Sequence, residues 1–179
     1  NQGSATSQRA LEITLVRNEI DAQAETLRFL NSSYIASYQS GANYDDITPA
    51  GQQWKLMQDS IIATGSVSAS SFGSESTCSS PPAGSFILDT RNAKFVAPSD
   101  GKLGLARTFS QVRYDNDGQI TTAEGIWIEA IRSKTVSGSP AGSQLNSGYI
   151  DFHIRTCWDS PGQSMPVTIG TIVRLYEPR

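Results

Sequence analysis

The first forty residues carry the hydrophobic periodicity of a long α-helix. From Gln8 to about Tyr38 there is neither Pro nor Gly, a stretch of roughly 45 Å if it is fully helical. Apolar side chains recur there at steps of three and four residues, which places them on one helix face. We expect this face to pack on a sheet, and the positions that form it are Ile13, Val16, Ile20, Ala24, Leu27, Tyr34 and Tyr38.

A second apolar ridge runs along the same predicted helix. Leu11, Leu15, Ala22 and Phe29 repeat every four or seven residues and lie roughly opposite the first face. Charged residues fill the flanks between the two faces: Glu12, Glu19, Asp21, Glu25 and Arg28. A helix that packs on a single sheet needs only one apolar stripe. The second ridge is therefore either covered by a loop of the same chain or kept for contact with another subunit.

The start of the helix has no clear capping signal. Ser4, Thr6 and Ser7 are each suitable N-cap residues, but none is followed three positions later by Glu or Gln, as a capping box requires. The chain also opens at Asn1 without an initiator Met. We expect the helix to be the C-terminal part of a longer one, in a processed or truncated product.

A variable region follows the long helix. The segment 39–48 is polar, and a short helix is predicted from about Pro49 to Ile62, with Pro49 in its first turn. Its apolar stripe consists of Trp54, Met57 and Ile61. Residues 65–84 are rich in Ser and contain Cys78, which is typical of a long surface loop.

The remainder of the chain reads as short strands separated by turns. The predicted strands are Phe86–Leu88, Lys94–Val96, Arg107–Tyr114, Gly125–Arg132, Tyr149–Trp158 and Val167–Tyr176. We expect the third and fourth to form a hairpin across Asn116-Asp117-Gly118. Helices followed by strands indicate an α+β fold, with the long helix on an antiparallel sheet of four or more strands. We expect one domain, 1–179, made of a helix (1–38), a helix-to-sheet region (39–84) and a sheet (85–179).

Composition narrows the class of protein. The 179 residues are 37% hydrophobic and only 17% charged, with many Gly, Ser and Thr, a mixture that suits a secreted, strand-rich domain. The net charge is -3 and no basic run exists, so a nucleic-acid partner is not expected. Cys78 and Cys157 are too far apart for a common zinc motif. We favour a disulfide in an oxidising compartment over two buried free thiols.

Two motifs suggest calcium binding or catalysis, but each also has a purely structural interpretation. Asp115 to Glu124 fits positions 3–12 of a calcium-binding EF-hand loop, but position 1 would be the cation Arg113, and the flanks read as strands. A hairpin turn in which Gly118 supplies a positive φ explains the same residues. His153 lies two residues from Asp151 on a polar strand face, without a GxSxG nucleophile motif. We therefore predict no catalytic residue, no metal and no cofactor.

The three tryptophans have two possible uses. Trp54, Trp127 and Trp158 could line a sugar-binding groove, because aromatic rings pack against sugar rings. Buried tryptophans more often pack in the core or against a sheet.

The order of these elements resembles the globular domain of type IV pilins and pseudopilins. The resemblance covers the helix 7–38, the loop region with Trp54, the strands after Ser85 and the paired Cys78 and Cys157. It implies a subunit of an extracellular pilus, with other pilin subunits as partners and a membrane contact only through an absent N-terminal half-helix. Leu11, Leu15, Ala22 and Phe29 would then be the assembly face.

Two other functions remain open. A surface or tip adhesin would bind a host-cell or glycan ligand through the loops 65–84 and 135–148. A secreted hydrolase is the remaining alternative.

Overall fold

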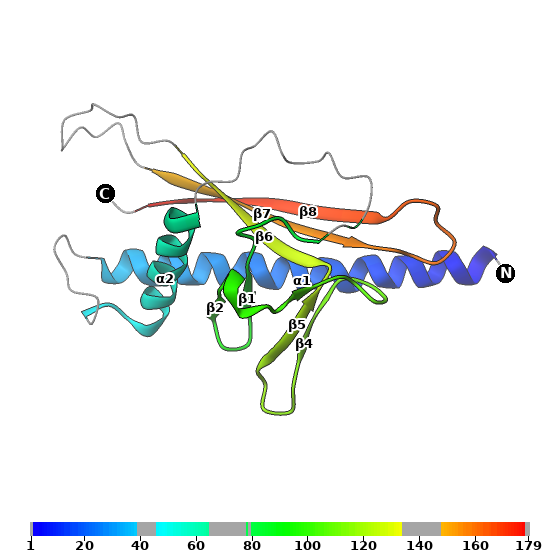
Figure 1. The fold of residues 1–179 in the computed structure, drawn as a ribbon, viewed down its shortest axis with the longest axis horizontal. Helices are drawn as coiled ribbons and strands as arrows, with labels where there is room; N and C mark the ends of the chain where they lie inside the picture. Colours follow the sequence, from blue (N-terminus) through cyan, green and yellow to red (C-terminus); the bar gives the residue numbers. More distant parts are fainter. Residues whose placement is uncertain (1, 39–45, 65–77, 79, 134–147, 178–179) are drawn as a thin grey trace.

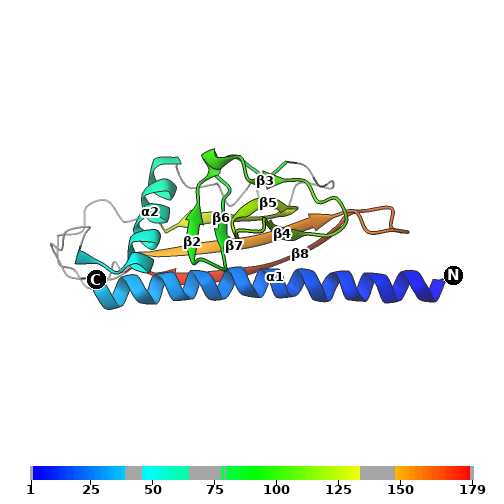
Figure 2. The same ribbon diagram turned by 90° about the horizontal axis from the view of Figure 1, so that it is seen from below.

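The computed structural model describes residues 2–38, 46–64, 78, 80–133 and 148–177. A helix, α1 (Gln2–Ser37), runs beneath the rest of the molecule along its whole length, as Figure 2 shows. A second helix, α2 (Pro49–Thr64), crosses α1 near its C-terminal end (Figure 1). The α+β class and the long N-terminal helix are thus confirmed.

The strands form three small sheets within the described residues. Strand β7 lies between β6 and β8, and both pairs are antiparallel. Strands β1 and β2 form an antiparallel hairpin, while β5 lies between β3 and β4. The bounds are β1 (Ile87–Asp89), β2 (Lys94–Val96), β3 (Leu103–Gly104), β4 (Gln111–Tyr114), β5 (Ile120–Glu124), β6 (Ile126–Arg132), β7 (Tyr149–Trp158) and β8 (Val167–Tyr176), with a 3-10 turn at Pro98–Asp100.

The predicted sheet of four or more strands is wrong for the described residues, where no sheet exceeds three strands. The cause is Gly125, which separates β5 from β6 and has a φ of 62°. A Cβ at this position would lie 2.4 Å from the carbonyl oxygen of Cys157. The chain therefore turns sharply at Gly125, and β4 and β5 project away from the sheet of β6, β7 and β8 (Figure 1).

The predicted hairpin between Arg107–Tyr114 and Gly125–Arg132 is also wrong. Strand β4 pairs instead with β5, which the sequence reading missed. The β5 segment ITTAE is short and half polar, so its strand pattern is weak. Strand β3 is only two residues long and pairs in parallel with β5, which departs from the expected antiparallel arrangement.

The core lies between α1 and the inner face of the sheets. On α1 the side chains of Val16, Ile20, Leu27 and Tyr34 are buried, and Ile13 packs partly buried against them. Alternate residues of β7 and β6 face them. The largest fully buried side chains are Trp54, Trp158, Phe86, Phe152, Leu27, Leu30, Met57, Ile87, Leu88, Ile126, Ile128 and Ile150.

Candidate assembly face

The N-terminal half of α1 is fastened to the sheet by a buried carboxylate. Glu12 is only 5% exposed. Its Oε2 accepts hydrogen bonds from the Trp158 indole N–H at 3.1 Å and from the Ser160 hydroxyl at 2.8 Å. Helix periodicity predicts Glu12 on a charged flank of the helix, but the side chain is buried against the sheet. Its two partners lie about 150 residues away along the chain, and no local pattern pointed to them.

Two amide side chains fasten the rest of α1. The side chain of Gln23 is fully buried; it donates to the Leu88 carbonyl at 2.8 Å and accepts from the Leu88 N–H at 2.9 Å. Farther along the helix, Asn31 donates to the Tyr176 carbonyl at 3.2 Å. Glu12, Gln23 and Asn31 are spaced by about 16 and 12 Å along the helix axis. Rolling α1 would break all of these contacts, so the orientation of both its faces is fixed.

The face of α1 opposite the core is exposed and apolar. Leu11 is 60% exposed, Phe29 is 52% exposed and Leu15 is 37% exposed. Ala22 lies between them and is half-buried. No residue in the described part of the chain buries Leu11, Leu15 or Phe29. The sequence left two alternatives for this ridge, a covering loop of the same chain or contact with another subunit. The described residues give no support to a covering loop.

Charged groups flank this face on α1. Arg28 and Glu25 form an ion pair across one turn and are largely exposed. On another side, Glu19 is half-buried, and this burial raises the pKa of its carboxyl group. A hydrogen bond from the Val112 backbone and the charge of Arg91 act in the opposite direction without cancelling the rise.

The two cysteines are joined. Cys78 and Cys157 form a disulfide with a Cα–Cα distance of 5.5 Å. Such bonds persist in oxidising environments, so the disulfide suggests an extracellular or secreted protein. None of the described helices is both long enough and apolar enough to cross a membrane.

The EF-hand-like segment is a hairpin turn between β4 and β5. Oδ1 of Asp115 accepts hydrogen bonds from the backbone N–H groups of Asp117 and Gln119, and Gly118 has a φ of 75°. Glu124, the would-be twelfth ligand, is buried on β5 and pairs with Arg113 at 3.0 Å. No cluster of three or more His, Cys, Asp or Glu side chains suited to a metal occurs among the described residues.

The Asp151 carboxylate is engaged by a cation on the next strand. Arg174 donates two hydrogen bonds to it, each of 2.7 Å, and these lower the pKa of Asp151. Burial lowers the pKa of the neighbouring His153, although the charges of Asp151 and Glu129 act in the opposite direction. The arrangement is a strand-to-strand ion pair beside a histidine.

Two of the three tryptophans belong to the core. Trp54 and Trp158 are fully buried, and Trp54 packs edge-on against Phe152. Trp127 lies on the opposite face of the sheet. The loops 65–84 and 135–148, where an adhesin ligand was expected, fall mostly outside the described residues.

Comparison with known proteins found no matching family model, no similar curated protein and no similar solved structure. The functional assignment therefore rests on the fold and the surface of this chain.

Proposed function

We propose that the chain is the headgroup of a type IV pilin-like subunit, which assembles into an extracellular filament through α1. The observation that supports this most strongly is the exposed apolar ridge of α1, which points away from the face that packs on the sheets. Contiguous exposed apolar patches are typical of protein–protein contact surfaces.

The geometry of the ridge suits helix-to-helix packing. From Leu11 to Phe29 it extends about 27 Å along the helix axis. By helix periodicity Asn18 and Glu25 lie on the same side, so between Leu11 and Phe29 the apolar ridge is bordered by one uncharged polar residue and one charged residue. Rows of this kind allow two helices to approach closely and to interlock. Burying the exposed half of a Leu or Phe side chain contributes about 1 kcal/mol.

The fixed orientation of α1 supports the same proposal. A subunit in a polymer must present its contact face in one direction, and Glu12, Gln23 and Asn31 hold α1 against rotation. The disulfide suits a filament that functions outside the cell.

The test replaces Phe29 with Asp in the protein as its source cell makes it. We expect Phe29→Asp to stop filament assembly, because a carboxylate in a packed helix interface is left without a partner. The isolated domain should still fold, since Phe29 is half exposed and outside the core. The measurements are the amount of subunit in sheared surface filaments and the thermal unfolding of the purified domain.

Leu56→Asp is the matched control. Leu56 is 45% exposed on α2, so the same apolar-to-acid change is made away from the ridge. Filaments at the level of the unmodified protein are expected for this variant. Normal filaments from Phe29→Asp would contradict the proposal, as would equal loss of filaments in both variants.

A further inference from the structure

Strand β8 is the outer strand of the sheet formed by β6, β7 and β8, and no strand of the described residues pairs with its other edge. Figure 1 shows it along the border of that sheet. Its 10 residues pair with β7 in one continuous register, without a bulge. A long, straight edge of this kind presents a row of main-chain groups with which another strand can pair.

The hydrogen-bond pattern shows which residues of β8 face this edge. The Glu177 N–H donates to the Gly148 carbonyl at 2.8 Å, so these two residues form a bonded pair of the antiparallel ladder. Bonded and non-bonded pairs alternate along such a ladder, so every second residue of β8 directs its N–H and C=O away from β7. The carbonyl of Tyr176 fits this rule, because it accepts a hydrogen bond from Asn31 of α1. The other residues in this phase are Thr168, Gly170, Ile172 and Arg174, and no group of the described chain bonds to their outward main-chain atoms.

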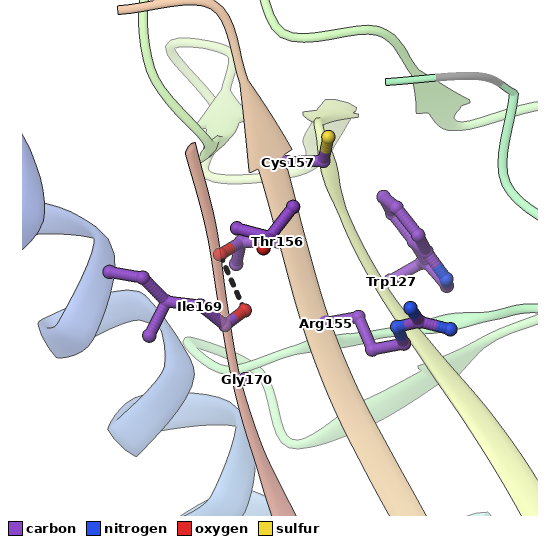
Figure 3. Close-up of a pocket in the computed structure, with 7 residues that line it drawn as sticks. Trp127, Arg155, Thr156, Cys157, Ile169 and Gly170 are labelled. Carbon is purple, nitrogen blue, oxygen red and sulfur yellow. Dashed lines mark hydrogen bonds between the residues drawn. The ribbon is translucent and has the colours of Figure 1, made fainter. Parts of the chain in front are cut away.

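The middle of β8 is open on both faces of the sheet. In Figure 3 the side chain of Ile169 points toward α1, whereas those of Trp127 and Arg155 on the neighbouring strands point away from it. Thr171 shares the face of Ile169 by alternation, and Ile172 lies on the other face. Both are exposed, Ile172 by 61%, so α1 leaves this part of the edge accessible.

Strand β8 lacks the features that protect most edge strands. Such strands usually carry Lys, Pro or a bulge, each of which discourages pairing. The sequence of β8, VTIGTIVRLY, has none of these and is rich in β-branched residues, which favour strands. Its single charged residue, Arg174, is held by two hydrogen bonds to Asp151 of the same sheet. The edge is therefore suited to pairing with another strand.

The positions of the outward groups favour β8 of a second copy as the partner. If two β8 strands run antiparallel about Thr171, Gly170 lies opposite Ile172 of the second copy. Thr168 likewise lies opposite Arg174 of the second copy. The residues that face the free edge are then paired with one another, in about eight main-chain hydrogen bonds.

The side chains are compatible in this register. The exposed side chain of Ile172 would lie beside Gly170, which has no side chain of its own. On the α1 face the two copies of Thr171 would form a cross-strand pair, and Thr–Thr pairs are favourable. No like charges lie opposite each other. Tyr176, whose carbonyl already bonds to Asn31, stays outside the new ladder.

We propose that two copies of the chain associate by antiparallel pairing of their β8 edges, so that both three-stranded sheets become one continuous sheet. The contact is separate from the proposed filament interface, because β8 is not part of the exposed ridge of α1. Pairing of two strands buries little surface, so the interface belongs to the small, transient class. We therefore expect dimers at chain concentrations of roughly 0.1–1 mM.

The test combines sedimentation equilibrium of the 179-residue chain with amide hydrogen exchange at rising concentration. The N–H groups of Gly170 and Ile172 should become protected as dimers form, because they gain acceptors. Those of Thr171 and Val173 already bond to β7 and should not change. A monomer up to about 1 mM would overturn the proposal. So would a dimer in which Gly170 and Ile172 exchange as fast as in the monomer.

Ile172→Lys places a cation in the middle of the pairing edge and should weaken dimerisation at least about tenfold. The fold should be unaffected, since Ile172 is largely exposed. Leu56→Lys is the matched control, because Leu56 is 45% exposed on α2, away from β8. This control should dimerise as the unmodified chain does. Undiminished dimerisation of Ile172→Lys, or equal loss in both variants, would show that the copies meet through another surface.

Discussion

Gln23 offers the sharpest test of how α1 is held. Its carboxamide forms two hydrogen bonds with the backbone of Leu88 on β1, where it takes the place that a neighbouring strand would occupy. Both residues are fully buried. Gln23→Met keeps the length of the side chain but removes both bonds. The N–H and the carbonyl of Leu88 are then left buried without partners, at a cost of about 1–3 kcal/mol for each group.

We therefore expect Gln23→Met to lower the free energy of unfolding by about 2–6 kcal/mol. The assay is urea unfolding without reducing agent, so that the disulfide stays intact, and it is monitored by tryptophan fluorescence. The midpoint urea concentration should fall, while the dependence of the unfolding free energy on urea concentration should not change. Asn18→Met is the control on the same helix, because Asn18 is exposed and lies away from the buried face of α1. It should change the free energy by less than about 0.5 kcal/mol.

A cost below about 0.5 kcal/mol for Gln23→Met would refute this reasoning. Amide exchange at Leu88 supplies an independent check. Its N–H should exchange faster in Gln23→Met, because the acceptor is gone, and unchanged protection would mean that Gln23 does not hold this group.

Two further predictions concern stability. The disulfide joins residues that are 79 positions apart in the sequence. Replacing both Cys78 and Cys157 by Ser should therefore lower the free energy of unfolding by about 4 kcal/mol, according to the chain-entropy model. Calorimetry of both proteins measures this difference, and a difference below about 1 kcal/mol would contradict the prediction. Burial raises the pKa of Glu19, so the folded state binds this proton more tightly than the unfolded state, and stability falls as pH rises from the ordinary Glu pKa through the raised one. Glu19→Gln should therefore stabilise the protein at neutral pH, with a gain that vanishes below pH 4.5; a gain that is equal at acid and neutral pH would contradict the burial argument.

Several elements were predictable from the sequence because local patterns determine them. The strands Tyr149–Trp158 and Val167–Tyr176 have the predicted bounds, since alternation over ten residues is a strong signal. The helix at Pro49 begins where predicted, because Pro suits a first turn. The long helix begins at Gln2, so Ser4, Thr6 and Ser7 lie inside it and none of them is its N-cap.

The candidate surfaces were predictable to different degrees. The two faces of α1 follow from helix periodicity, which fixes the direction of each side chain once the helix exists. The row across the sheet in which Trp127, Arg155 and Gly170 lie side by side could not be foreseen. Strand register is set by pairing between distant segments.

The sequence by itself determined the helices, most of the strands and the α+β order, because hydrophobic period and turn residues act over a few positions. Only the tertiary structure decided which strands share a sheet and which polar groups fasten α1. Gly125 turns the chain between two sheets with a positive φ, and the carbonyl oxygen of Cys157, more than thirty residues later in the sequence, leaves no room there for a Cβ. Glu12 and Gln23 likewise find their partners 146 and 65 residues away. Contacts over such separations depend on the whole fold, and no local pattern encodes them.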